Sequence, residues 1–163
     1  MRFQAEHRFG APVGAVTDVL VDPGFHRELE LPDLRLLDVV DHRDGGDGAF
    51  LALRYSYVGH LDPVASRLLG GQRLTWLQEL EVDRATGTGQ LRFAVEGAAD
   101  RLRGFARFRL TPEGDETVWA LDGELRVRVP LVGGAAERRI VTGFLDRLRL
   151  EAQQVAERLS AAT

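Results

Sequence analysis

The sequence predicts an α+β fold in which a curved, seven-stranded antiparallel sheet grips one long C-terminal helix, with two short helices after the first strand. Two observations carry this prediction. Over most of the chain, apolar residues alternate with polar ones, which is typical of strands with one buried face. After residue 134, the apolar residues recur at helical spacing instead. A long helix that follows a run of strands must lay its apolar stripe on their sheet, and a long sheet curls around it.

The N-terminal part is predicted to form one strand and two short helices. Residues 2–9 alternate between polar and apolar side chains, as a half-buried strand does. Pro12 suits the first turn of a helix, because proline lacks the N–H that this turn leaves unbonded. We expect the Asp-Pro-Gly segment at residues 22–24 to end this helix. A second short helix is expected from Phe25 to about Leu31.

Six further strands follow at short intervals, which predicts hairpin connections and therefore an antiparallel sheet. Their turns are rich in Asp, Gly and Pro, as at residues 44–47 and 112–115. The connection at residues 59–71 is longer. The predicted strands span residues 34–41, 51–57, 74–82, 91–95, 106–110 and 119–129.

The C-terminal helix has the clearest pattern in the chain. We expect the glycine pair at residues 133–134 to form a flexible break before it, and the helix to be roughly 35 Å long. Its charged residues are expected mostly outside the apolar stripe, Arg147 and Glu151 among them. The stripe consists of Ile140, Val141, Phe144, Leu145, Leu148, Ala152, Val155 and Leu159.

The composition narrows the class of protein. With 163 residues, 44% of them hydrophobic and 28% charged, the chain is expected to form a single domain over residues 1–163. Cysteine is absent, which excludes disulfides, thiolate nucleophiles and cysteine metal sites. Lysine is absent as well, which excludes a lysine Schiff base. The net charge of −4 and the scattered arginines argue against nucleic-acid binding.

The sequence shows no signal for secretion or for a membrane span. The chain opens on alternation rather than on a basic and then apolar leader. No apolar run approaches the roughly 20 residues that a spanning helix needs. We therefore expect a cytoplasmic protein that is a monomer or a homodimer.

Three stretches carry a resemblance to a known superfamily. They read MRFQAEHRFGAPVGAVTDVLVDPGF at the N-terminus, LGGQRLTWLQELEVD in the middle and VPLVGGAAERRI before the C-terminal helix. Together with the order of elements, they resemble the helix-grip fold of the START, polyketide-cyclase and birch-pollen-allergen (SRPBCC) superfamily. Within it, the chain is similar to an uncharacterised actinobacterial family, domain of unknown function 2505. None of the three stretches is a catalytic motif, so the resemblance implies the fold rather than an activity.

Members of this superfamily typically bind lipids, sterols, polyketides or other hydrophobic small molecules in a cavity between sheet and helix. The inward phase of the strands supplies candidate lining residues for such a site. The alternative is that these side chains simply pack against each other as core. The candidates are Leu53, Tyr55, Tyr57, Trp76, Gln78, Phe93, Phe108, Trp119 and Leu121 from the sheet, and Phe144, Leu148 and Val155 from the helix.

Gln78 is the polar member of this otherwise apolar face. A buried amide needs a hydrogen-bond partner, which a ligand, a water molecule, Tyr55 or Tyr57 could provide. We favour water or a tyrosine over a dedicated ligand contact.

The connection at residues 59–71 is either a lid over the cavity mouth or a short helical cover that seals one end of the sheet. As a lid, it would lie beside the glycine pair at residues 133–134. Its candidate rim residues are His60, Leu61, Val64, Leu68 and Leu69.

Few titratable groups are placed for chemistry. His7 lies on the apolar phase of the first strand and is expected to be a hydrogen-bonded core residue, whereas His26 and His42 are expected to be solvated. The four histidines lack the spacing of a metal site, so we expect no metal and no cofactor. No inward carboxylate is evident. The strand carboxylates on the outward phase are Glu79, Glu81, Asp122 and Glu124.

Three functions remain open. The leading one is a protein that binds or carries a hydrophobic small molecule. The second is an enzyme of the aromatase, cyclase or dehydratase type, as found in the superfamily, with Tyr55, Tyr57, Gln78 and His7 as candidates for moving protons. The third is a module that binds a protein partner through its outer face or its lid.

Overall fold

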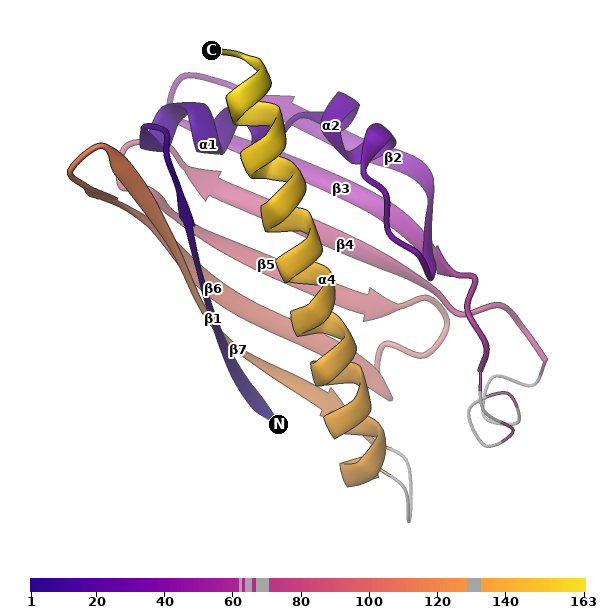
Figure 1. Ribbon diagram of the computed structural model, residues 1–163. Helices are drawn as coiled ribbons and strands as arrows, with labels where there is room; N and C mark the ends of the chain where they lie inside the picture. The colour runs from indigo at the N-terminus through magenta and orange to yellow at the C-terminus, as the bar shows by residue number, and fades with distance from the viewer. Residues whose placement is uncertain (62, 64–65, 67–70, 129–132) are drawn as a thin grey trace.

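Seven antiparallel strands form one sheet in the computed structural model, which describes residues 1–61, 63, 66, 71–128 and 133–163 (Figure 1). The strands are β1 (Arg2–Phe9), β2 (Leu34–Asp44), β3 (Gly48–Tyr57), β4 (Thr75–Asp83), β5 (Thr88–Val95), β6 (Leu102–Glu113) and β7 (Glu116–Val127). The helices are α1 (Val13–Leu20), α2 (Pro23–Glu28) and α4 (Gly133–Ala161). The predicted α+β class and its order of elements are confirmed.

The strand order across the sheet is β1-β7-β6-β5-β4-β3-β2. From β2 to β7, each strand pairs with the next one along the chain, as the short turns predict. β1 pairs with β7 instead, so the first two strands lie at opposite edges and α1 and α2 connect them. Figure 1 shows α4 lying diagonally across one face of the sheet, with its C-terminal half beside α1.

β2 is an exposed edge strand with two irregularities. Its register with β3 shifts at Leu37 and again at Val40, so neither residue has a registered partner. Both side chains are exposed. Bulges increase the local twist and hinder the pairing of an open edge with another strand. They therefore help to curve the sheet and protect its edge at the same time.

Three phenylalanine rings lie across glycines of the neighbouring strand. A Cβ atom added at Gly104 would lie 2.0 Å from the Phe93 ring, far inside van der Waals contact. Only a residue without a side chain lets this ring lie against the backbone of the next strand. The three registered pairs are Phe3–Gly123, Gly89–Phe108 and Phe93–Gly104.

α1 and α2 follow one another almost without a break. The first helix ends within two residues of the predicted position, since α1 ends at Leu20, but residues 22–24 also begin α2, and this start was not predicted. The Asp22 carboxylate accepts hydrogen bonds from the N–H groups of Gly24 (2.8 Å) and Phe25 (3.2 Å), with a proline at the first helical position. An Asp-Pro pair can start a helix as well as mark a turn, and here it starts one.

α4 begins earlier than predicted. The glycine pair at residues 133–134, expected to form a flexible break, lies in its first turn. The Glu137 carboxylate accepts hydrogen bonds from the Val127 N–H (2.9 Å) and from the N-terminal ammonium of Met1 (3.3 Å), so it ties α4 to β7 and to the residue that precedes β1. Residues 129–132, where we predicted the end of the last strand, lie outside the described residues.

The C-terminal half of α4 is held by α2 and by the segment that follows α2. The Gln154 amide donates to the backbone carbonyl of Glu30 (2.8 Å) and accepts from the N–H of the same residue (2.9 Å). Arg158 donates to the carboxylate of Glu28 (2.6 Å). Every residue of the predicted apolar stripe is buried or packs against the core, so the stripe is confirmed.

Candidate functional site

The candidate site is the interior between the inner face of the sheet and the middle of α4. The structure buries most of the side chains predicted to line it. The buried ones are Leu53, Tyr55, Gln78, Phe93, Phe108, Trp119, Leu121, Phe144, Leu148 and Val155. Trp76 is half-buried and packs against the same core. Tyr57 is half-buried at the end of β3, where its hydroxyl lies 3.5 Å from the carbonyl oxygen of His60.

At one end of this interior, aromatic rings from α4, β1 and β5 pack against each other. The centroid of the Phe144 ring on α4 lies 5.1 Å from the ring centroids of both Phe3 and Phe93. Phe3 and Phe93 lie in turn over Gly123 and Gly104. We call these five residues the aromatic end. Phe93 and Phe144, predicted to line a cavity, pack here against each other as core.

The middle of α4 presents two charged side chains to the same interior. Arg147 is only 7% exposed and Glu151 only 5% exposed. Nη2 of Arg147 lies 3.7 Å from Oε2 of Glu151, an ion pair that is longer than a hydrogen bond. Two predictions are therefore wrong, because these charges do not lie outside the buried stripe and an inward carboxylate does exist.

The spacing of both residues along the helix would have predicted that they are buried. Arg147 follows Phe144 by three positions, and Glu151 follows Leu148 by three. Residues three apart lie on the same side of a helix, so both charges belong to the buried stripe by angle. The prediction was wrong because it assigned the charged residues to the exposed side by residue type and not by their positions around the helix axis.

Tyr55 contacts the Arg147 guanidinium. The guanidinium carbon lies 4.6 Å from the centroid of the Tyr55 ring, a cation–π contact, and Trp76 stacks on this ring at 5.8 Å between centroids. Burial raises the pKa of Tyr55 to about 12, although the charge of Arg147, and a polar contact of its guanidinium with the hydroxyl that falls outside hydrogen-bond geometry, oppose this shift. The hydroxyl therefore stays protonated at neutral pH and can both donate and accept a hydrogen bond.

His26 is buried rather than solvated, which corrects the prediction for it. Its Nε2 lies 2.8 Å from the carbonyl oxygen of Leu20. Since a carbonyl can only accept, Nε2 is the donor and Nδ1 carries the lone pair. Burial lowers the pKa of His26, although the Glu151 carboxylate opposes this shift. His42 is exposed, as predicted.

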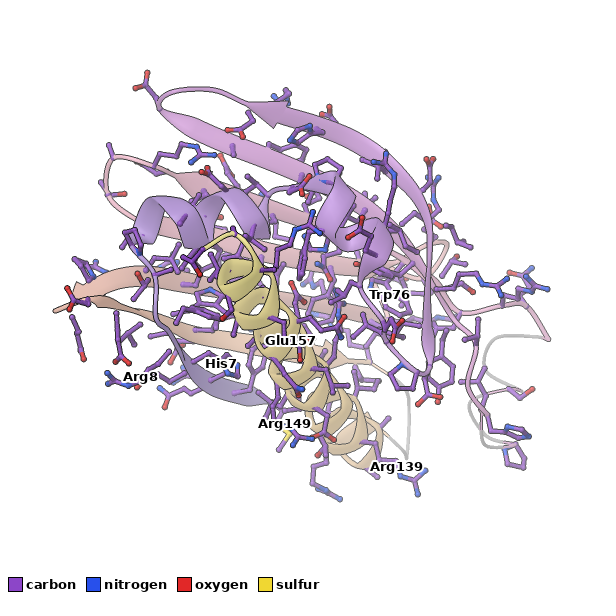
Figure 2. The ribbon with its side chains drawn as sticks, turned by 45° about the horizontal axis from the view of Figure 1, so that its top comes forward. His7, Arg8, Trp76, Arg139, Arg149 and Glu157 are labelled. Carbon is purple, nitrogen blue, oxygen red and sulfur yellow. The ribbon has the colours of Figure 1, made fainter. Side chains whose placement is uncertain are left out.

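His7 approaches the interior from β1. Its ring centroid lies 5.7 Å from that of Trp119, and burial lowers the pKa of His7 against the opposing effect of Glu151. Its Nε2 has no hydrogen-bond partner among the described residues, so the prediction of a hydrogen-bonded core histidine is not confirmed. In Figure 2, His7 and Trp76 lie on either side of α4.

Several buried polar atoms of this interior have no hydrogen-bond partner in the described part of the chain. They include the Tyr55 hydroxyl, Gln78 Oε1, Trp119 Nε1, both Nε and Nη2 of Arg147, and Nδ1 of His26. An unpaired buried polar group costs about 1–3 kcal/mol, and native cores contain few of them. Within the described residues, neither Tyr55 nor Tyr57 donates a hydrogen bond to Gln78 Oε1, so the tyrosine partner that we considered is not confirmed there. We call Tyr55, Gln78, Arg147, Glu151 and His26 the polar centre.

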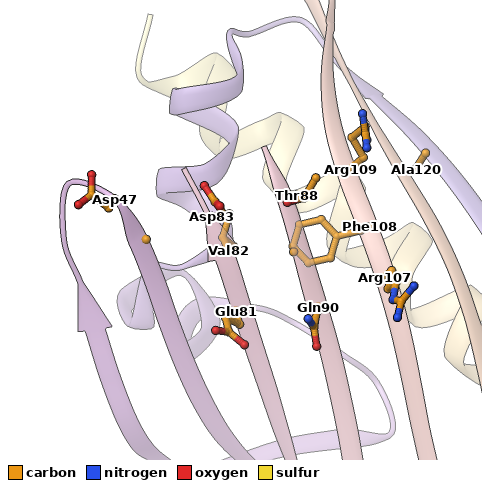
Figure 3. A pocket seen from close by; sticks show the side chains of 12 residues that line it. Asp47, Glu81, Val82, Asp83, Thr88, Gln90, Arg107, Phe108, Arg109 and Ala120 are labelled. Carbon is orange, nitrogen blue, oxygen red and sulfur yellow. The ribbon is translucent and has the colours of Figure 1, made fainter. Parts of the chain in front are cut away.

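Two open grooves lined by described residues lie outside this interior. The first crosses β4 to β6, where Glu81, Gln90 and Arg107 lie in register on adjacent strands (Figure 3). The second lies between α4 and the segment after α2, beside Leu31 and Leu150. Neither groove is lined by any of the buried polar atoms without a partner. The interior, by contrast, contains several of these atoms.

Two of the four outward carboxylates face an arginine of a hairpin-connected strand, as predicted. Glu79 lies in register with Arg92 on β5, and Asp122 lies in register with Arg107 on β6. Asp122 also accepts a hydrogen bond from the Gln4 amide at 2.8 Å. Glu79 and Asp122 therefore lie opposite arginines on neighbouring strands, which is the arrangement of a cross-strand pair.

The other two outward carboxylates are Glu81 and Glu124. Glu81 faces Phe50 and Gln90, whereas Glu124 forms its ion pair with Arg126 on the same strand.

No group of three or more His, Asp or Glu residues that could hold a metal ion occurs within residues 1–61, 63, 66, 71–128 and 133–163. Among the helices of those same ranges, none is both long and apolar enough to cross a membrane. Of the predicted lid residues, His60 is exposed and Leu61 is half-buried. Val64, Leu68 and Leu69 lie outside the described residues, so the lid stays a prediction.

Known proteins share this architecture. A family model described as a protein of unknown function (DUF2505) matches residues 4–159. The protein TTHA0849 from Thermus thermophilus has a TM-score of 0.70 at 22% identity, over 100% of this chain and 99% of that chain. A START superfamily protein from Mycobacterium smegmatis has a TM-score of 0.59 at 16% identity, over 99% of both chains.

Norcoclaurine synthase from Thalictrum flavum, solved as a point mutant with a transition-state analogue, has a TM-score of 0.65 at 20% identity, over 99% of this chain and 95% of that chain. No curated protein matches the chain. At these identities, the similar structures establish the fold alone. The fold is the START-like helix-grip fold that the sequence resemblance implied.

Proposed function

This chain belongs to the family of proteins of unknown function DUF2505, and from this premise we propose that it binds a hydrophobic small molecule between its sheet and α4. The apolar part of the ligand would contact inward side chains of the sheet, such as Leu53 on β3 and Trp119 on β7, and Leu148 on α4. Its polar part would reach the polar centre.

The observation that supports this proposal is the combination of apolar walls with polar groups whose contacts are incomplete. Leu53, Leu121 and Leu148 are almost fully buried. Tyr55 and Arg147 are buried among them with polar atoms that have no partner in the described chain. A purely structural core would pair such groups or replace them with apolar ones. A bound molecule supplies the missing partners, and burying about 250 Å² of its apolar surface contributes about 6 kcal/mol.

The fold offers a second line of support. Norcoclaurine synthase from Thalictrum flavum has the same fold and was solved in complex with a transition-state analogue. A protein with this fold therefore binds a small organic molecule. The residues that would bind a ligand in this chain are proposed from the geometry of this chain itself.

Two measurements test the proposal. Native mass spectrometry of the protein purified without added ligand should detect a bound small organic molecule. After this molecule is extracted, the neutral dye Nile red should bind with a rise in fluorescence, because it enters an apolar environment.

A matched pair of variants shows whether the dye binds inside. Leu148→Trp adds volume to the interior, since Leu148 is only 2% exposed, and should abolish dye binding. Leu37→Trp makes the same substitution at an exposed position of β2 and should leave binding unchanged. A wild-type protein that neither carries a molecule nor binds the dye would contradict the proposal, as would a folded Leu148→Trp variant that binds normally.

An enzyme of the cyclase or dehydratase type is the second candidate function, and Glu151 is the observation that favours it. A carboxylate inside a low-dielectric interior, with its charge acting on Tyr55, is suited to proton transfer. Of the four residues predicted to move protons, Tyr55 and Gln78 lie buried on adjacent strands. Conversion of the molecule identified by mass spectrometry should then slow in Glu151→Gln. An unchanged rate would exclude this candidate.

A further inference from the structure

We propose that the ligand carries a carboxylate group and that Arg147 binds this group through one edge of its guanidinium. The inference rests on the proposed function, because it specifies the chemistry of a molecule that the interior must first accept. It assigns recognition of the polar head to one side chain, and it leaves the hydrocarbon body to the apolar walls.

Two neighbouring nitrogens of the Arg147 guanidinium are hydrogen-bond donors without a partner in the described chain. Its Nε and Nη2 are both buried, and neither has a hydrogen-bond partner among the described residues. In a planar guanidinium, the N–H groups on these two nitrogens point in the same direction from one edge. Their spacing matches the two oxygens of a carboxylate, which can accept both bonds at once. A ketone or an alcohol offers one oxygen, so it would leave part of this edge unpaired.

The donor pair is held in place. The guanidinium lies 4.6 Å from the centroid of the Tyr55 ring, which is itself stacked on Trp76. Arg147 is 7% exposed, so its charge lies inside the protein rather than reaching bulk water. A donor pair that is already oriented loses little conformational entropy when it binds, which favours affinity.

Glu151 is the ion-pair partner of Arg147, but it does not occupy the donor pair. Oε2 of Glu151 lies 3.7 Å from Nη2, beyond hydrogen-bond distance. The two charges sum to zero, which limits the cost of burying Arg147 when no ligand is bound. The same negative charge repels an incoming anion. Removing it should therefore strengthen the binding of a carboxylate, which gives the inference a second prediction with the opposite sign.

The experiment compares an acid with its own ester. Displacement of Nile red gives the affinities for decanoic acid and for methyl decanoate at about pH 8, where the free acid is ionised. Both compounds have the same hydrocarbon chain. Wild-type protein should bind the acid about tenfold more tightly, because charge-assisted hydrogen bonds are the stronger ones.

Three variants locate the preference. Arg147→Met should weaken the binding of decanoate to about the level of the ester. Arg147→Lys keeps a positive charge but lacks the flat donor edge, so it should also lose most of the preference. Glu151→Gln should bind decanoate several-fold more tightly than wild type, because the repelling charge is gone. Circular dichroism checks that each variant is folded, and Arg147→Lys with Glu151→Gln carries the test if Arg147→Met does not fold.

The outcomes separate the two proposals. Equal binding of acid and ester by wild-type protein would overturn the carboxylate inference and leave the proposed function standing. A preference that survives in both Arg147 variants would overturn it as well. Failure of the dye, the acid and the ester to bind at all would mean that the proposed function itself is wrong.

Discussion

The aromatic end and the polar centre both use α4 and the inner face of the sheet, and the polar centre adds His26 from α2. Only the aromatic end has all of its contacts made within the described chain. At the aromatic end, the Phe144 ring contacts Phe3 and Phe93, and a glycine lies beneath each of those two rings. At the polar centre, Arg147 contacts Tyr55 and Glu151, but Nε and Nη2 have no hydrogen-bond partner in the described chain.

This difference separates the part of the interior that stabilises the fold from the part that we propose to bind a ligand. Shape complementarity at the aromatic end needs nothing beyond the chain itself, so it serves packing. Unpaired polar groups at the polar centre lower stability. Groups that lower stability and are nevertheless present in a fold are expected at functional sites. Four substitutions test this distinction.

Gly104→Ala should disrupt the aromatic end, and we expect it to have the largest effect. The new Cβ would lie 2.0 Å from the Phe93 ring, so the ring or the strand must move. The free energy of unfolding should fall by about 3 kcal/mol in urea denaturation. Gly143→Ala is the matched control on α4. A Cβ there meets nothing within 4 Å, and the variant should gain about 0.5–1 kcal/mol. Unchanged stability of Gly104→Ala would show that the ring does not depend on the glycine.

At the polar centre, Arg147→Met should lower the free energy of unfolding, because it leaves Glu151 buried without its ion-pair partner. We expect about 2 kcal/mol, below the roughly 3–5 kcal/mol for a close buried pair, because these two groups are 3.7 Å apart. The double variant Arg147→Met/Glu151→Met should recover most of this loss, since a buried ion pair contributes little compared with apolar side chains of similar volume. Urea denaturation of both single variants and the double variant gives the coupling energy. Losses that simply add would show that the two charges do not interact.

Acid should lower the stability of the fold through His26 at the polar centre. Burial lowers the pKa of His26 below its usual value of 6.5, so the unfolded chain takes up this proton more readily than the folded one. The contribution of neutral His26 to the free energy of unfolding is therefore fully present above pH 6.5. It decreases as the pH falls below 6.5, by at most about 1.4 kcal/mol per pH unit for one histidine.

His26→Gln can keep the donor to Leu20 without the titrating ring, so its stability should depend less on pH than that of wild type below pH 6.5. His42→Gln, at an exposed position, should keep the wild-type slope. Urea denaturation across this pH range measures both slopes. If His26→Gln kept the full wild-type slope, the acid sensitivity would belong to another group, such as His7, whose pKa is lowered as well.

The smallest effect is expected from Tyr55→Phe. This change removes a buried hydroxyl that has no partner in the described chain, so stability should stay within about 0.5 kcal/mol of wild type or rise. Thr117→Val is the matched control, because it removes a buried hydroxyl that donates to the Ala11 carbonyl at 2.6 Å. It should cost about 1–1.5 kcal/mol in thermal or urea denaturation. A similar cost for Tyr55→Phe would reveal a partner for that hydroxyl.

Most of the fold could be predicted because strand and helix periods are local properties of the backbone. Alternation located each of the strands, and the helical stripe located α4 and its buried apolar residues. The helix boundaries were less certain, since Asp22 and the proline after it can either end one helix or begin the next. Deciding between the two required the hydrogen bonds that the Asp22 carboxylate makes.

The candidate site could be predicted only in part. The inward phase identified Tyr55 and Gln78 correctly as buried, but the position of His26 near a helix end predicted that it is solvated, and polarity placed Arg147 outside the stripe. A buried charge has the same residue type as an exposed one. The position around the helix axis distinguishes them, and that information was present in the sequence for Arg147. For His26 it was not, because a six-residue helix has too short a pattern to define a buried side.

The sequence by itself determined the order of the elements and which apolar side chains point inward, because both follow from residues that are neighbours in the chain. Only the tertiary structure decided which distant residues meet, such as Tyr55 with Arg147 and Phe93 with Gly104. Those contacts depend on strand register and on where α4 crosses the sheet, and they are established when the whole chain packs. This packing also leaves two donors of Arg147 without a partner in the described chain. The proposed recognition of a carboxylate depends on these donors.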